Sequence, residues 1–366
     1  MRANVIRFPT SEPGDTRFLD SLISSQQIDP RDIVALLCKT EGTGTPSDFS
    51  RELASERYSR FLSQKLSLSP SDLRRRVALI FSSGCDGVIS PHGYIFLTTG
   101  RERPALGKSK RLTIGIARTR TLEPEEIGAR KHVLLVADAV REGLKNAYIE
   151  DPKDVHTVFV KSPVLLGVTR GESESRNLEG HAKNRASSAP LTRAASALGV
   201  AVAIGEVQEE QIKEEQIGQD SHLYSTVAIT FSGTELAHCE VIVLGNSAFA
   251  QSDFIIRHGL LTDLLDGEGV KTLLREADLD FRCCPDEKTR QTIAAIFMKV
   301  GILPSGRVRG KRTTILESDI NFTRHLRAAA SGVIASIIGE TEVFVSGGAE
   351  HQGPPGGGVV SVIVRV

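Results

Sequence analysis

The sequence predicts an α/β protein built from three repeated units around a central cleft. Apolar, β-branched runs alternate with helical stretches, and the same order of elements occurs three times along the chain. Each repeat also carries a lysine, an arginine and a serine turn in a fixed order. The three sets are Lys39, Arg51 and Ser82, then Lys161, Arg193 and Ser232, then Lys299, Arg324 and Ser346. We therefore expect one kind of site to be built three times, in a pseudo-threefold barrel.

Each unit is expected to open with a buried strand that ends in its lysine. The runs are 32–39, 155–161 and 292–299, and the last one is richer in alanine. Short apolar runs bounded by turn residues are typical of buried strands, although their periodicity alone does not exclude a helix. The lysines are thus predicted to lie at strand ends.

A helix that begins near the arginine is expected next. The stretches 193–206 and 324–340 share many small residues and a closing Gly-Glu pair, which is typical of a helix end. The more highly charged stretch 50–66 takes this place in the first unit.

Two more strands are expected to complete each unit. The first strand of each pair leads into the serine turn and spans 77–84, 227–233 or 343–348, and the second spans 93–97, 240–244 or 359–366. Polar, turn-rich segments at 100–110 and 246–253 divide the chain into units at 1–103, 111–249 and 254–366.

Composition narrows the classes of function. The 366 residues are 40% hydrophobic and 25% charged with a formal net charge of zero, as in ordinary globular proteins. Aromatic residues make up 5% and tryptophan is absent, so stacking on nucleic acid is not expected. We see no secretory signal and no apolar run of membrane-spanning length, and we expect a cytoplasmic protein without a membrane partner. Five cysteines without a C-x-x-C pair argue against a disulfide framework or a zinc site.

The repeated residues have a chemistry in common. A lysine can activate a serine hydroxyl only when it is neutral, and burial or nearby positive charge lowers its pKa. Arginines donate forked hydrogen bonds to carbonyl oxygens, and backbone N–H groups of glycine-rich turns stabilise an oxyanion. Such a ring of groups suits a compact ligand with several carbonyls. A single strand-end lysine is more often a surface charge, and only the threefold order favours a site.

Two further features have less specific interpretations. His92 and His351 follow serine turns, but neither shows a metal-ligand spacing. The glycine-rich segment 347–358 could bind a hard cation through its carbonyls or form a tight turn, and the turn is favoured.

Several short segments carry a resemblance that spans essentially the whole chain. They include Lys39-Thr40-Glu41-Gly42, Ser90-Pro91-His92, Val160-Lys161-Ser162-Pro163, Gly245-Asn246-Ser247, Thr323-Arg324-His325, Ser346-Gly347-Gly348 and Glu350-His351-Gln352-Gly353-Pro354. With these segments in this order, the chain resembles the cyanuric acid hydrolase and barbiturase family of ring-opening amidohydrolases. The resemblance implies a pseudo-threefold α/β barrel, a homotetramer, and hydrolysis of a C–N amide bond in a small cyclic imide or ureide.

The resemblance also implies roles for particular residues. Lys161 would be the base and Ser232 the nucleophile, because the middle of three Lys-Ser pairs acts in this family. Arg51, Arg193 and Arg324 would hold ring carbonyls. The remaining residues expected to line the substrate site are Lys39, Lys299, Ser82, Ser83, Gly84, Gly233, Ser346, Gly347, Phe231 and Phe322.

The middle serine turn departs from the family pattern. A gap-free match places Phe231 at the nucleophile position and Ser232 one residue later, where a strand would point it to the opposite face unless a bulge intervenes. The internal repeat instead aligns 77–82 with 227–232, and this alignment favours Ser232. Phe231 and Phe322 would make the site smaller and less suited to a fully polar ring such as cyanuric acid.

The departures leave alternatives open. The chain could act on a different ring or in the ring-forming direction, with Ser82 or Cys85 in use, or it could be a ligand-binding protein without activity. The resemblance implies a metal ligand two residues past the third lysine, but this chain has Gly301 there. Only a weakly held divalent cation is then compatible, and no cofactor is expected to be required. Its ligands would come from Ala349, Gln352, Gly353, Pro354 and Gly357.

Overall fold

The computed structural model describes all residues except 46–47, 101–105, 108, 166–187 and 319. Within the described chain, three four-stranded sheets have the same strand order. Each sheet is built from strands of one third of the sequence. The first sheet is β1 (Arg2–Pro9), β4 (His92–Thr99), β2 (Ile33–Thr40) and β3 (Ala78–Ser83). The second is β5 (Arg111–Thr121), β8 (His238–Ser247), β6 (Val155–Pro163) and β7 (Ala228–Gly233). The third is β9 (Phe254–Leu261), β14 (Gly358–Arg365), β10 (Ile293–Val300) and β13 (Phe344–Gly347).

Pairing is the same in each sheet. The edge strand and the lysine strand both run antiparallel to the strand between them, and the lysine strand runs parallel to the serine strand. A lysine and a serine that end two parallel neighbours must therefore lie at the same edge of the sheet.

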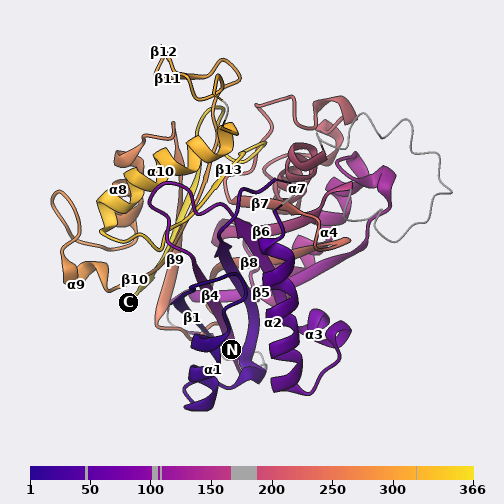
Figure 1. Ribbon diagram of the computed structural model, residues 1–366, viewed down its shortest axis with the longest axis vertical. Coiled ribbons are helices and arrows are strands. Elements are labelled where there is room, and N and C mark those ends of the chain that lie inside the picture. The colour runs from indigo at the N-terminus through magenta and orange to yellow at the C-terminus, as the bar shows by residue number, and fades with distance from the viewer. Residues whose placement is uncertain (46–47, 101–105, 108, 166–187, 319) are drawn as a thin grey trace.

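The helices lie on the outside of the strands (Figure 1). An outer hydrophobic core lies between each sheet and the longer helices that pack on it, and these helices bury apolar side chains in that core. The helices of the three regions are α1 (Arg17–Ser24), α2 (Ser50–Leu66) and α3 (Pro70–Arg76); α4 (Arg130–Asn146) and α7 (Ser188–Ile204); and α8 (Gly267–Glu276), α9 (Glu287–Arg290) and α10 (Phe322–Ile338). A short hairpin of β11 (Arg307–Val308) and β12 (Lys311–Arg312) follows β10.

A central core joins the three sheets. Their inner faces contribute apolar residues to one cluster, in which the rings of Phe159, Phe231, Phe297 and Phe344 contact one another. Side chains alternate along a strand, so the inner face continues from these rings toward the strand ends. Lys39, Lys161 and Lys299 stand within two residues of the ends of β2, β6 and β10, at that end of the central core.

The predicted elements are largely present. The segment ending in the third lysine is a strand, and Gly339, with φ of +66°, ends α10 in the left-handed conformation expected of a C-terminal glycine. The edge strands β1, β5 and β9 and the helices α1, α3, α4 and α8 were not predicted from the sequence.

The α/β class is confirmed, but the described strands do not form a closed barrel. They pair only within their own sheets, apart from isolated bridges between Arg2 and Gln251 and between Ser225 and Gln352. Shared apolar packing, rather than a continuous ladder of hydrogen bonds, holds the sheets together. None of the described helices is both long and apolar enough to cross a membrane.

Candidate active site

The three repeat lysines are buried and their amines meet at the end of the central core. Nζ of Lys39 donates to Oγ of Ser82 at 3.4 Å and to the carbonyl of Ser83 at 3.1 Å. Nζ of Lys299 lies 3.2 Å from Oγ of Ser346. The lysines thus face the turns that the sequence analysis grouped with them.

Two lysines also reach across to the neighbouring sheet. Nζ of Lys161 donates to the carbonyl of Phe81 on β3 at 2.7 Å, and Nζ of Lys299 donates to the carbonyl of Thr230 on β7 at 2.7 Å. In addition, Nζ of Lys39 lies 5.4 Å from the ring centre of Phe344 on β13. Each lysine therefore bridges two of the three sheets, and the predicted convergence is observed.

Burial lowers the pKa of every lysine in this cluster. Burial, with the nearby guanidinium of Arg327, brings the pKa of Lys39 down to about 7. Burial lowers the pKa of Lys161 to about 8, against the opposing effect of Glu235. The pKa of Lys299 falls well below its usual value through burial and the charge of Arg193. A neutral amine is thus accessible near pH 7, as a general base requires.

The register of the parallel strands distinguishes the middle unit. Lys39 pairs with Ser82, and Lys299 pairs with Ser346, whereas Lys161 pairs with Phe231. The gap-free family match, which places Phe231 at the nucleophile position, therefore agrees with the strand register. The internal alignment of 77–82 with 227–232, which would place Ser232 opposite Lys161, is wrong by one residue. No bulge corrects the offset in the β6–β7 pair.

Ser232 accordingly faces away from the lysine. Its Oγ accepts a hydrogen bond from Nη1 of Arg193 at 3.3 Å, and only its backbone carbonyl accepts one from Lys161, at 3.1 Å. Phe231 points into the central core, stacks on Phe159 and lies 5.4 Å below Nζ of Lys299. The middle unit has an aromatic ring where the other two units have a hydroxyl.

Three acidic side chains near the lysines were not predicted from the sequence. Asp86, Glu235 and Glu350 each stand four residues beyond the position that pairs with a lysine. This shared spacing was the available signal. All three carboxylates are buried or nearly so, and each pairs with a cation of the site.

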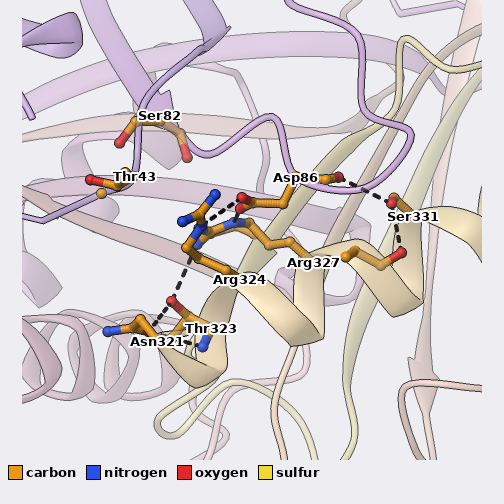
Figure 2. Close-up of polar contacts among 12 residues, drawn as sticks. Thr43, Ser82, Asp86, Asn321, Thr323, Arg324, Arg327 and Ser331 are labelled. Atoms are coloured by element: carbon orange, nitrogen blue, oxygen red, sulfur yellow. Dashed lines mark hydrogen bonds and ion pairs between the residues drawn. The ribbon is translucent and has the colours of Figure 1, made fainter. Parts of the chain in front are cut away.

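Asp86 and Glu350, the acids of the first and third units, pair with arginines on helices that pack against a different sheet from their own. Asp86 accepts hydrogen bonds from Nε of Arg324 at 2.9 Å and Nε of Arg327 at 2.5 Å, both on α10 (Figure 2). Glu350 accepts from Nε and Nη2 of Arg193 on α7, at 2.9 and 2.7 Å. Burial alone would raise the pKa of Glu350, but Arg193 holds it below its usual value. Arg327 was not among the predicted residues.

The middle acid behaves differently. Glu235 forms an ion pair with Nζ of Lys161 at 2.8 Å, and both side chains are almost fully buried. Arg51, at the start of α2, is buried, and its Nε has no hydrogen-bond partner among the described residues. Its charge helps to lower the pKa of Lys161. A buried donor without an acceptor is costly and rare, and it is consistent with a place for a ligand oxygen.

The glycines of the serine turns make room for these charged groups. A side chain at Gly84, where φ is +99°, would come within 2.5 Å of the Arg327 guanidinium, and one at Gly233 would overlap the Glu235 carboxylate. Gly347 lies close to Thr323 at the start of α10. Ser83, which pairs with Thr40, is buried beside the Gly84 turn.

Three other residues considered in the sequence are Phe322, Cys85 and His351, of which Cys85 is close enough to Lys39 for their charges to interact. Phe322 is 37% exposed and lines a neighbouring cavity of about 350 Å³ together with Leu303 and Leu316. Burial raises the pKa of the Cys85 thiol to about 11, which leaves little thiolate for attack. His351 links two loops by accepting from the backbone N–H of Gly218.

The glycine-rich loop does not fit a tightly bound divalent cation. The carbonyls of Ala349, Pro354 and Gly357 already accept backbone hydrogen bonds, the last from Gly301 at 2.8 Å. Oε1 of Gln352 accepts from the N–H of Thr230, and Gly301 supplies no carboxylate. No cluster of three metal-binding side chains occurs among the described residues. Hard cations in proteins are held by oxygen donors that usually include carboxylates.

Comparison with known proteins identifies the family. Residues 4–365 match the family model described as "Amidohydrolase ring-opening protein". The chain belongs to this family of ring-opening amidohydrolases. A cyclic amide hydrolase of Azorhizobium caulinodans is 42% identical over 366 residues, which is 100% of both chains. A cyanuric acid amidohydrolase of Bradyrhizobium diazoefficiens is 42% identical over 364 residues, covering 99% of this chain and 98% of the relative.

Solved structures agree with the family assignment. A structure described as "Cyanuric acid hydrolase: evolutionary innovation by structural concatenation" superposes with a TM-score of 0.90 at 37% identity, over 100% of this chain and 99% of the other. The cyanuric acid hydrolase structure from A. caulinodans gives a TM-score of 0.86 at 37% identity, with the same coverage. The relatives of this amidohydrolase are thus hydrolases named for cyclic amides, and its fold is theirs.

Proposed function

We propose that the chain hydrolyses a C–N amide bond of a small cyclic imide or ureide and so opens the ring. The observation that carries the proposal is the meeting of three buried lysine amines, two of them within hydrogen-bond distance of a serine hydroxyl. Membership of the ring-opening amidohydrolase family supports the same reaction.

The chemistry follows from the groups present. A neutral lysine removes the serine proton as the hydroxyl attacks a ring carbonyl, and nearby arginines stabilise the oxygen that becomes negative. Water then releases the ring-opened acid. The resemblance assigns this work to Lys161 and Ser232, and that assignment stays a prediction. Its geometry is less direct than in the outer units, because Oγ of Ser232 contacts Arg193 instead of the lysine amine.

The ring at Phe231 supports a substrate that is not polar on every edge. Two of the three equivalent positions offer hydroxyls, Ser82 and Ser346, while the third offers only aromatic carbon. A carbonyl placed against Phe231 would lose its hydrogen bonds to water without replacement. We therefore propose a barbiturate-like ring or a cyclic imide, with a carbon edge toward Phe231, in preference to cyanuric acid.

The larger architecture forms part of the proposal. We propose that units 1–103, 111–249 and 254–366 are pseudo-threefold repeats arranged as a barrel around the lysine cluster, which the common strand order supports. The homotetramer implied by the family resemblance is a further prediction, and sedimentation of the purified protein tests it.

A substrate panel tests the function. Purified protein is incubated with barbituric acid, cyanuric acid and five- and six-membered cyclic imides. The masses of the products are then measured by mass spectrometry. Gain of one water by a ring supports hydrolysis. Loss of one water from an open-chain acid would indicate the ring-forming direction. Recovery of an unchanged, tightly bound ring would favour a binding protein.

Single substitutions test whether Lys161 and Ser232 carry out the reaction. Ser232→Ala and Lys161→Ala are compared with Ser336→Ala, a matched control on the exposed face of α10. Loss of turnover in the first two alone would support Lys161 and Ser232. Full turnover in Ser232→Ala would remove Ser232 as the nucleophile.

A further inference from the structure

The lysine that pairs with Phe231 is the least suited of the three to act as a base. Glu235 lies 2.8 Å from Nζ of Lys161, and a carboxylate at this distance stabilises the protonated amine. The corresponding carboxylates, Asp86 and Glu350, are held by arginines. No ion pair joins the amine of Lys39 to an acid in the described part of the chain.

The amine of Lys39 instead has the contacts expected of a general base positioned beside its serine. Its amine donates to Oγ of Ser82 and to one backbone carbonyl, and the side chain is completely buried. Ser82 is in register with Lys39, so both side chains extend from the same inner face of adjacent parallel strands. The hydroxyl and the amine are therefore oriented by the sheet itself.

Ser82 and Ser346 differ in whether a nearby arginine has donors left for a ligand. Arg193, next to the Ser346 turn, already engages Nε and Nη2 with Glu350 and Nη1 with Ser232. Arg324 contacts Asp86 through Nε, and its side chain is 41% exposed. The terminal nitrogens of Arg324 are thus better placed to receive a ligand oxygen than those of Arg193.

A second donor lies in the same cluster. Nη2 of Arg327 is buried and has no hydrogen-bond partner among the described residues. The Arg327 guanidinium packs against the turn at Gly84, two residues after Ser82. Figure 2 shows Arg324 and Arg327 both contacting Asp86, and it draws Ser82 in the same view with no contact to either arginine. Guanidinium donors fixed beside a nucleophile are what a developing oxyanion requires.

We propose that Ser82 is the nucleophile of the ring opening, with Lys39 as its base and Arg324 as the group that binds the carbonyl under attack. This inference rests on the proposed function and replaces the middle serine by the serine of the first unit. The physical reason is that Phe231 removes the hydroxyl from the middle position, whereas Lys39 and Ser82 retain both members of the pair.

The steps balance with water as the only co-reactant. Oγ of Ser82 forms a bond to the ring carbonyl carbon, its proton passes to Nζ of Lys39, and the carbonyl electron pair moves to the oxygen facing Arg324. Collapse of this intermediate breaks the ring C–N bond, and the Lys39 ammonium returns its proton to the leaving nitrogen. Water then attacks the acyl-serine, gives a proton to Lys39, and Ser82 leaves with that proton.

The test locates the acyl group directly and uses the ring from the panel that wild-type enzyme opens fastest. Turnover is quenched in acid, the protein is digested, and peptides are mapped for the added mass of the opened ring. We expect the adduct on Ser82. An adduct on Ser232 or Ser346 would overturn the inference and leave the proposed function standing. A wild-type enzyme that opens no ring would overturn both.

Kinetics of serine variants provide the second readout. We expect Ser82→Ala to lower kcat by at least about 1,000-fold, because nucleophile and base act as a unit. Ser336→Ala, on the exposed face of α10, is the matched control and should change kcat by less than about threefold. Ser82→Cys keeps a nucleophile in place and should retain measurable turnover if Ser82→Ala is inactive for chemical reasons. Turnover of folded Ser82→Ala within about tenfold of wild type would refute the assignment.

Discussion

Replacement of Lys39 by methionine should make the protein more stable at neutral pH and less sensitive to alkaline pH. Methionine fills most of the space of the lysine stem but carries no charge to bury. In the folded protein the Lys39 pKa is about 7, against an ordinary value of 10.5. Between these two pH values the unfolded chain binds the proton and the folded chain does not.

The sign and size follow from proton linkage. Stability rises with pH wherever the unfolded state binds more protons, so the cost of Lys39 is complete below about pH 7 and absent above about pH 10.5. The difference between the folded and unfolded pKa values of Lys39 corresponds to about 5 kcal/mol of free energy of unfolding, of which the wild-type protein regains about 2 kcal/mol between pH 7 and 9. Lys39 also lowers the pKa of Lys299, so its removal reduces the pH dependence of the variant further.

Urea unfolding at pH 7, 8 and 9 measures the effect. We expect Lys39→Met to exceed wild type in free energy of unfolding at pH 7, and this excess to shrink by about 2 kcal/mol at pH 9. Lys153→Met, at an exposed position, serves as the matched control and should give a constant difference. A constant difference for Lys39→Met as well would show that Lys39 keeps its proton on folding, and the argument for a neutral base would fail.

Three other substitutions test the surrounding framework by urea unfolding. Asp86→Asn removes the charge that holds two arginines of α10 and should lower stability by about 3 kcal/mol, whereas a loss below about 1 kcal/mol would mean that this ion pair is solvated. Phe231→Ala leaves a void beside Phe159 and should cost about 3 kcal/mol, while an unchanged midpoint would place the ring outside the core. Gly358→Ala puts a methyl group onto the carbonyl oxygen of Lys299 and should cost about 3 kcal/mol, and normal stability would contradict the close approach of β14 and β10.

Much of the fold could be predicted from local sequence. The lysine strands, the serine strands and helix α2 (Ser50–Leu66) follow from apolar runs, turn residues and helical patterning within each segment. The edge strands were harder, because a strand such as β5 (Arg111–Thr121) carries several exposed or half-buried polar residues and lacks a continuous apolar run. Its place in the sheet depends on pairing with β8, more than a hundred residues away.

The α/β class, the threefold order of lysine, arginine and serine, and the family follow from the amino-acid sequence without the structure. Tertiary structure alone decided that Lys161 pairs with Phe231, and that Glu235 binds this lysine while Asp86 and Glu350 bind arginines. The reason is that periodicity is a property of one segment, whereas register and charge pairing depend on segments brought together by folding. A one-residue offset between two strands exchanges the faces of a sheet, and no local pattern reports it.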